Sequence, residues 1–178
     1  MPNHMVIREA VTTKIRIVFN ALAKEIGRSS LNDLVDPGPS LLPDLTGLLP
    51  CFRECQHAIQ ADIRKAFFMV EVRQEDRPYL GFVWLQEDGE VEIWQLKKLP
   101  FGVNCAPFLL SAVLQYHLSQ HEKSNESTPS VQEVISLLRR SFYVDDCISS
   151  LNTAAEAQNF KAISTEVLKG AGMDLRKW

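Results

Sequence analysis

The sequence has no long hydrophobic run and no segment that resembles a secretory leader. A membrane-spanning helix needs about 18 or more consecutive apolar residues, and no such run occurs in the 178 residues. The opening Met1-Pro2-Asn3-His4 lacks the basic and then apolar stretch of a signal peptide. We therefore expect neither a membrane span nor a signal peptide, and no membrane partner.

Cysteine is also scarce, which argues against a fold held together by disulfides. The chain has only four cysteines, and they are widely spread: Cys51, Cys55, Cys105 and Cys147. That number and spread fit reduced thiols in an intracellular protein better than a disulfide framework. We expect a cytoplasmic or particle-associated location.

An overall excess of basic charge is missing as well. The formal net charge is −3, whereas a stand-alone nucleic-acid binder is more often basic. The charge is nevertheless uneven, since residues 1–28 hold five basic and two acidic side chains. The chain also shows no internal repeat, and its 46% hydrophobic content is ample for the core of one or two small domains. The net charge therefore disfavours tight autonomous binding of nucleic acid, although the N-terminal segment is locally basic.

The clearest local pattern is an acidic pair between apolar residues near the C-terminus. Phe142–Val144 and Cys147-Ile148 are typical of two short strands. Asp145 and Asp146 are then the two residues of a tight hairpin turn, or they sit at its lip. Asp is common in turns for purely local reasons, so this stretch alone also fits plain turn chemistry.

A second acidic position makes a functional site the better interpretation. His57–Ile63 alternates like a strand and carries Asp62 near its end. A charge in an apolar strand is costly unless something pairs with it. If Asp62 lies beside the acidic hairpin, three carboxylates cluster and repel one another in the absence of cations. Hard oxygen ligands suit Mg²⁺, and two such ions roughly 3.5–4 Å apart are the usual device for phosphoryl transfer.

Three ordered stretches resemble successive motifs of reverse transcriptases: Ala61–Phe67, Leu99–Phe108 and Tyr143–Asp146. The sequence resembles in particular the BEL/Pao type of LTR retrotransposon. Four further segments share that resemblance, so that it covers nearly the whole chain: Asn3–Arg8, Thr12–Phe19, Ser30–Asp33 and Lys177-Trp178. A lone Tyr-Val-Asp-Asp would be a weak signal, whereas several ordered motifs are a strong one.

The resemblance implies an RNA-directed DNA polymerase with two Mg²⁺ ions, Mn²⁺ being an alternative. Asp62 and Asp145 would bridge the ions, and Asp146 would be a third, weaker ligand. Lys177 would be the acid that protonates the leaving pyrophosphate. The implied partners are an RNA or DNA template with its primer and deoxynucleoside triphosphates.

The resemblance also implies a nucleotide pocket. Arg8, Lys14 and Arg16 would hold the triphosphate, for which the planar fork of arginine is well suited. Phe67 would be a steric gate that collides with a 2′-hydroxyl. The remaining residues of this expected pocket are Ile63, Phe101 and Gly102. Many retroviral enzymes carry Gln where this chain has Phe101, which leaves base-pair contacts there open.

We expect an α+β fold: a reverse-transcriptase-like palm, with an antiparallel sheet backed by helices, and fingers. The fingers would cover roughly residues 1–56 and 68–98, and the palm roughly residues 57–67 and 99–178. The thumb is expected to be absent, together with the RNase H and integrase segments of a parent polyprotein. The isolated chain would then be weak or inactive, since duplex affinity depends on many phosphate contacts. The alternative is a non-catalytic retroelement-derived fragment that acts as an interaction module or has no function.

Several local elements follow from periodicity and capping signals. A leucine stripe predicts a helix over residues 41–52, with Pro43 in its first turn and Pro50 kinking or ending it. The apolar run Phe67–Val72 predicts a strand. Further signals predict a hairpin of residues 79–85 and 91–96, a helix capped at Ser130, and a helix capped at Thr153 that ends at Gly170.

Overall fold

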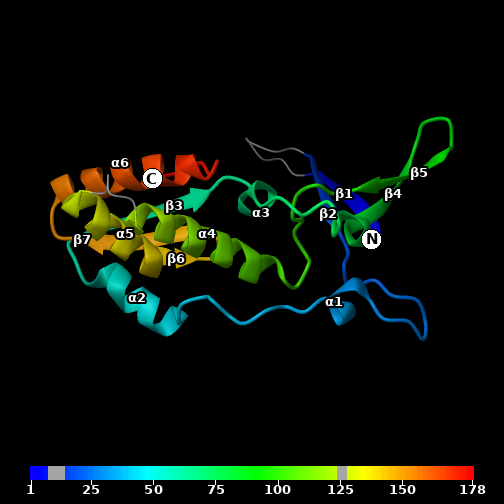
Figure 1. The fold of residues 1–178 in the computed structure, drawn as a ribbon, viewed down its shortest axis with the longest axis horizontal. Helices are drawn as coiled ribbons and strands as arrows, with labels where there is room; N and C mark the ends of the chain where they lie inside the picture. Colours follow the sequence, from blue (N-terminus) through cyan, green and yellow to red (C-terminus); the bar gives the residue numbers. More distant parts are fainter. Residues whose placement is uncertain (8–14, 124–127) are drawn as a thin grey trace. The chain divides into compact units, whose positions relative to one another are not determined.

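The computed structural model describes residues 1–7, 15–123 and 128–178, and the chain divides into two compact units (Figure 1). Unit 1 comprises Met1–Pro39 and Phe67–Ala106, and unit 2 comprises Ser40–Ala66 and Pro107–Trp178. Residues 40–56, which we expected in the fingers, belong to unit 2, and residues 99–106, which we expected in the palm, belong to unit 1. The names fingers and palm for the two units stay a prediction.

Unit 2 is built on a four-stranded antiparallel sheet with the strand order β6-β7-β3-β8. The inner strand β3 pairs with β7 on one side and with β8 on the other, and β6 forms a hairpin with β7. The strands are β3 (His57–Ile63), β6 (Phe142–Tyr143), β7 (Asp146–Leu151) and β8 (Leu175–Arg176).

Helices surround this sheet (Figure 1), and most of the buried hydrophobic side chains of unit 2 belong to them. Helices α2, α5 and α6 all contact β7, and α6 also contacts β3 and β8. The helices are α2 (Leu45–Arg53), α4 (Ala106–Lys123), α5 (Pro129–Ser141) and α6 (Ala154–Gly170). The side chains packed at their centre are almost fully buried: Leu110, Leu118, Ile135, Leu138, Phe160 and Leu168. The predicted α+β fold with an antiparallel sheet backed by helices is confirmed.

The ends of α6 agree with the sequence, whereas the start of α5 does not. Thr153 caps α6 through a capping box with Glu156, and the helix ends at Gly170 as predicted. The predicted cap at Ser130 is wrong, because Thr128 accepts from the backbone N–H of Val131 and the helix begins at Pro129. Proline at the first helical position needs no N–H partner, so the earlier threonine is the better cap.

Helix α2 is shorter at its start and longer at its end than the leucine stripe predicts. It begins at Leu45, because the Asp44 carboxylate accepts from the backbone N–H of Thr46 and caps the helix there. Pro43 therefore precedes the helix. Pro50 lies inside α2 without ending it, so the helix tolerates the loss of one backbone donor.

Unit 1 contains two two-stranded antiparallel sheets, β1-β2 and β4-β5. The predicted hairpin of residues 79–85 and 91–96 is confirmed as β4 and β5. The segment Phe67–Val72 is not a strand, since Ala66–Met69 form a single helical turn. A short apolar run does not distinguish helix from strand by periodicity. The elements are β1 (Asn3–Ile7), β2 (Ile15–Phe19), α1 (Leu31–Leu34), α3 (Ala66–Met69), the 3₁₀ turn η1 (Arg77–Leu80), β4 (Gly81–Leu85) and β5 (Val91–Gln95).

Candidate active site

The hairpin that carries the acidic pair has a two-residue turn, but the turn is not Asp145-Asp146. Tyr143 pairs with Asp146 across the hairpin, so the turn residues are Val144 and Asp145. Asp146 is the first residue of β7, which corresponds to the alternative in which it sits at the lip. The expectation that both acids form the turn is wrong, because the sequence does not fix the pairing register.

The backbone of this turn is strained. Val144 has a φ of 58°, and a two-residue hairpin turn with positive φ at its first position normally has glycine there. A β-branched residue in this conformation is an outlier that costs about 1–3 kcal/mol. Among the described residues, the other non-glycine residues with positive φ are Lys65 and Lys177. Both belong to unit 2 as well, and Lys177 contacts Asp62 of the acidic site.

The sheet register brings Asp62 to the acidic hairpin. Asp62 of β3 lies directly opposite Asp146 of β7, and directly opposed residues project their side chains from the same face of a sheet. The next residue of β3, Ile63, donates its backbone N–H to the carbonyl oxygen of Asp145 at 2.9 Å. The strand and the turn are therefore joined at the residues that carry the three carboxylates.

Two basic side chains from the C-terminal segment neutralise Asp62. The Lys177 Nζ donates to Asp62 Oδ2 at 3.1 Å, and a guanidinium nitrogen of Arg176 lies 3.8 Å from the same oxygen. The Asp62 side chain is only 19% exposed. Its second oxygen, Oδ1, is buried and has no hydrogen-bond partner among the described residues. A buried carboxylate oxygen without a partner is costly, so this oxygen is free to take a ligand.

The three carboxylates lie near enough to influence one another. Burial raises the pKa of the Asp145 carboxyl above its usual value. A hydrogen bond from its own backbone N–H and the ammonium of Lys177 lower that pKa, whereas the charges of Asp146 and Asp62 raise it. Such mutual repulsion is what a bound cation relieves.

The donor chemistry of this cluster fits a hard divalent cation. It offers carboxylate oxygens only, and Oδ1 of Asp62 still lacks a partner, as Mg²⁺ ligation requires. The described residues nevertheless contain no group of three or more His, Cys, Asp or Glu side chains already arranged to hold a metal ion. In the structure the basic side chains of Lys177 and Arg176 balance the charge of Asp62.

Comparison with known proteins identifies the family. Residues 9–177 match the family described as reverse transcriptase (RNA-dependent DNA polymerase). The chain belongs to the reverse transcriptase family. The main interpretation of the sequence, a reverse transcriptase domain, is thereby confirmed.

The chain is similar to a retroviral polyprotein and to two foamy viral structures. It is 26% identical over 139 residues to the Gag-Pol polyprotein of bovine immunodeficiency virus (strain R29), a match that covers 72% of this chain and 9% of the polyprotein. In fold it is similar to the prototype foamy virus protease-reverse transcriptase (CSH mutant), with a TM-score of 0.67, 17% identity, and 98% of this chain and 19% of that chain covered. A foamy viral protease-reverse transcriptase solved in complex with double-stranded DNA gives the same TM-score at 19% identity, with 98% and 25% covered. The chain thus spans a minor part of each relative, and these matches do not support the BEL/Pao group in particular.

The predicted nucleotide-pocket residues of unit 1 can be placed only in part. Phe67 is 6% exposed, and its ring packs edge-on against the half-exposed ring of Phe101 at 4.6 Å. Gly102 has a φ of 94°, and a Cβ there would lie 3.0 Å from the carbonyl oxygen of Phe19, so this position needs glycine. Arg16 is exposed on β2, whereas Arg8 and Lys14 lie outside the described residues.

The structure adds one residue to the acidic site that the sequence does not predict, and it shows that one predicted pocket residue is buried. Arg176 joins the acidic site because β8 pairs with β3 and places Arg176 opposite Asp62, a register that no local signal reveals. Ile63 is 1% exposed, so its side chain belongs to the core of unit 2, and its predicted contact with a nucleotide stays untested.

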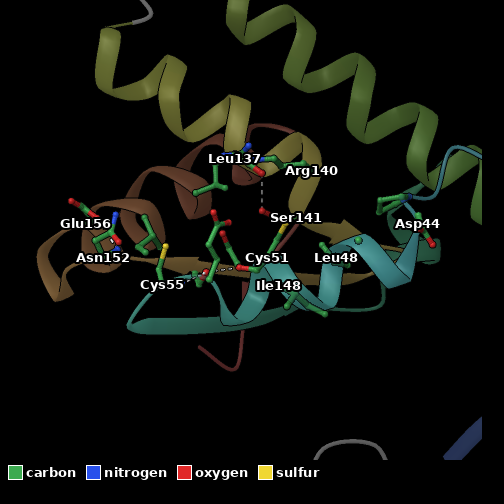
Figure 2. Close-up of a pocket in the computed structure, with 16 residues that line it drawn as sticks. Asp44, Leu48, Cys51, Cys55, Leu137, Arg140, Ser141, Ile148, Asn152 and Glu156 are labelled. Carbon is green, nitrogen blue, oxygen red and sulfur yellow. Dashed lines mark hydrogen bonds between the residues drawn. The ribbon is translucent and has the colours of Figure 1, made fainter.

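Unit 2 also contains a cavity of about 580 Å³ that holds none of the predicted catalytic residues. Figure 2 shows side chains of α2, α5 and β7 around it, among them Cys51, Leu137 and Ile148. Its polar groups partly bind one another, since the Ser150 hydroxyl donates to the Cys51 carbonyl and accepts from the Cys55 backbone N–H. The cavity and the acidic site are therefore separate features of unit 2.

No helix among the described residues is both long enough and apolar enough to cross a membrane.

Proposed function

We propose that this chain forms the fingers and palm of an RNA-directed DNA polymerase from a BEL/Pao-type LTR retrotransposon. It would extend a primer on an RNA or DNA template by adding deoxynucleotides. The observation that carries this proposal is the direct pairing of Asp62 with Asp146 beside Asp145. The family match over residues 9–177 supports it, and the BEL/Pao assignment rests on the sequence resemblance described above.

Asp62, Asp145 and Asp146 would hold two Mg²⁺ ions, or Mn²⁺ in their place. When bound, these ions would activate the primer 3′-hydroxyl and neutralise the charge of the triphosphate. The chain contributes the carboxylate oxygens, the buried Oδ1 of Asp62 in particular. It also contributes the strained turn residue Val144, which would hold the backbone of Asp145 in position.

Lys177 would donate a proton to the leaving pyrophosphate. Its ammonium group lies 3.1 Å from Asp62 Oδ2, so a protonated donor is held beside a carboxylate of the proposed site. General-acid catalysis by a positioned side chain contributes about 10²- to 10⁴-fold to a rate. Arg176, which also neighbours Asp62, would stabilise the charge of that carboxylate when no metal ion is bound.

For unit 1 we propose the roles that the family resemblance implies. Arg16, together with Arg8 and Lys14, would bind the triphosphate through bidentate and single hydrogen bonds. Phe67 would be the steric gate against ribonucleotides, and its ring is held edge-on against Phe101. Gly102 would allow close approach of the backbone. An intracellular location remains part of the same proposal.

A non-catalytic role as an interaction module is the competing proposal. Its basis is the formal net charge of −3. A net acidic chain would bind a primer–template duplex weakly, because duplex affinity depends on many phosphate contacts.

Primer extension decides between the two proposals. A labelled DNA primer on an RNA template is incubated with Mg²⁺, deoxynucleotides and a high concentration of the chain at low salt. We expect slow addition of a few nucleotides that falls steeply as salt rises. Asp145→Asn should lower the rate about 10³-fold, whereas Glu133→Gln, on an exposed position of α5, should not change it.

Circular dichroism shows whether each variant is folded. Equal rates of primer extension by Asp145→Asn and by the wild type would show that the acidic site does not catalyse nucleotide addition. If a folded chain joined to a reverse transcriptase thumb also fails to extend the primer, the non-catalytic proposal is favoured instead. Processive synthesis by the 178-residue chain at physiological salt would show that the expected dependence on further segments is wrong.

A further inference from the structure

The hairpin of β4 and β5 in unit 1 presents an unusual surface for a protein that handles nucleic acid. Residues 78–96 contain four carboxylates and no lysine or arginine: Glu87, Asp88, Glu90 and Glu92 are the acidic residues. None of the four forms an ion pair with any residue that the structure describes. Figure 1 shows the turn of this hairpin projecting away from β1 and β2 of the same unit.

Two tryptophans lie on the same face of this hairpin as Glu92. The register pairs Trp84 with Glu92 and Phe82 with Trp94, so these four side chains share one face. Phe82 is partly buried, and its ring packs against Phe19 at 5.2 Å. The indoles remain 43% exposed at Trp84 and 52% exposed at Trp94.

The two indoles and the carboxylates line a common hollow. A depression of about 680 Å³ is bordered by Trp84, Trp94, Glu87, Asp88 and Glu92, among others. The Trp94 Nε1 donates to Glu92 Oε2 at 2.7 Å, which fixes one carboxylate beside the ring. The exposed tryptophans and the negative charge therefore lie at the same place.

This combination selects for an organic cation. Lysine and arginine side chains bind over indole faces, and neighbouring carboxylates strengthen the attraction. A phosphate backbone or an anionic membrane would be repelled by the same four charges. A bare divalent metal is disfavoured, because the described residues contain no group of three such ligands placed to hold one.

The spacing of the indoles fits an extended peptide. Trp84 and Trp94 are diagonal neighbours in the register, a separation of roughly 7–8 Å. Alternate residues of an extended strand lie about 6.5 Å apart on one side of the chain. Two basic side chains at alternate positions can therefore reach the two indoles together.

We propose that the β4–β5 hairpin docks an extended basic protein segment, whose alternate lysine or arginine side chains stack on Trp84 and Trp94. The carboxylates of Glu87 and Glu92 complement the charge of that segment. This surface lies within unit 1 and uses none of the residues assigned to polymerisation. The inference therefore stands or falls independently of the proposed function.

Fluorescence anisotropy of a labelled peptide tests the proposal. The probe is a fluorescein-labelled dodecapeptide of alternating arginine and alanine, and its matched control carries neutral citrulline in place of each arginine. The full chain should bind the arginine peptide, and the citrulline peptide should bind at least about tenfold more weakly. Failure of the wild-type chain to bind, or equal binding of both peptides, would overturn the proposal.

Variants locate the binding surface. Trp84→Ala/Trp94→Ala and Glu87→Gln/Glu92→Gln should each weaken peptide binding about tenfold or more. Glu133→Gln/Glu166→Gln removes the same charge from exposed positions of α5 and α6 and should change the affinity less than twofold. Circular dichroism verifies that all variants fold. Equal loss in the control pair would show that only net charge matters and would overturn the proposal.

Two other occupants appear as distinct results. If the tryptophan variant loses affinity for a single-stranded RNA oligonucleotide but not for the peptide, the surface binds nucleic acid and the proposal is wrong. If sedimentation shows a wild-type dimer that the tryptophan variant lacks, and the peptide does not compete with it, the occupant is a second copy of the chain and the proposal is again wrong.

Discussion

Two hairpins of this chain carry acidic residues at their turns, and they differ in what covers them. The β6–β7 hairpin belongs to a four-stranded sheet, and its strand β7 contacts α2, α5 and α6. The β4–β5 hairpin is a sheet of only two strands, and all five residues of β5 are exposed. The same residue type therefore meets a partly buried environment in one hairpin and solvent in the other.

This difference in burial separates the chemistry of the two turns. In the first turn, burial raises the pKa of Asp145. Two residues further on, burial raises the pKa of the Cys147 thiol to about 12, which keeps that thiol protonated. At the second turn the carboxylates stand among exposed apolar side chains and form no ion pair with the described residues. This difference agrees with our two proposals, a reactive site at the desolvated turn and a docking surface at the solvated one.

Core truncation should separate the two regions most strongly. Phe160 of α6 is fully buried, so Phe160→Ala should lower the free energy of unfolding by about 3–5 kcal/mol. Ile93 of β5 is 80% exposed, so Ile93→Ala should change it by less than about 0.5 kcal/mol. Urea denaturation followed by circular dichroism measures both. Similar losses for the two variants would mean that the hairpin is covered in solution.

Glycine substitutions compare the backbones of the two hairpins. Val144 has positive φ, so Val144→Gly should relieve strain and leave stability equal or up to about 1 kcal/mol higher. Val91 of β5 has no such strain, so Val91→Gly should cost about 1 kcal/mol through lost strand propensity. Thermal unfolding of the two variants is the measurement. A Val144→Gly variant as unstable as Val91→Gly would show that the acidic turn is not strained.

The pH dependence of stability should have opposite signs at two aspartates. The pKa of Asp145 is raised, chiefly by burial, so ionisation there destabilises the fold as pH rises through the raised pKa. Asp145→Asn should therefore raise the melting temperature at neutral pH, and the gain should vanish below the ordinary carboxyl value of 3.8.

Asp33 of unit 1 supplies the reverse case. Hydrogen bonds from the Ser30 backbone and hydroxyl, and then from Lys24, lower its pKa. Its ionised form therefore stabilises the fold above the ordinary value, and this contribution disappears as pH falls. Asp33→Asn should lower the melting temperature at neutral pH but not in acid. Melting curves from pH 3 to pH 8 test the pair, and shifts of the same sign would contradict the account.

The sequence predicts that Asp62 lies near the acidic pair, as the pairing of β3 with β7 shows, but it does not predict the register of the hairpin. Asp62 and the acidic pair stand out because charges interrupt apolar strands, and pairing then brings Asp62 opposite Asp146. The exact turn does not stand out, because only the ladder decides that Val144 and Asp145 form it. Arg176 is invisible for the same reason, since its place opposite Asp62 depends on non-local pairing.

The helices and strands show the same difference between local signals and non-local pairing. The capping box of α6 was predictable because Thr153 and Glu156 act within one turn. The run Phe67–Val72 predicts a strand yet begins in a helical turn, because a short apolar segment has no period that separates the two. Prediction thus succeeded where a signal is local and failed where tertiary packing or strand pairing decides.

Binding of Mn²⁺, followed by the paramagnetic resonance signal of the free ion, tests the central claim most directly. With a deoxynucleoside triphosphate present, the chain should bind the ion saturably beyond what the nucleotide binds alone. Asp62→Asn/Asp145→Asn should weaken this binding about tenfold or more, whereas Glu87→Gln/Glu92→Gln, which removes two charges from the solvated hairpin, should leave it unchanged. Equal binding by all three proteins, or an equal loss in both variants, would contradict the assignment of the acidic site to Asp62 and Asp145.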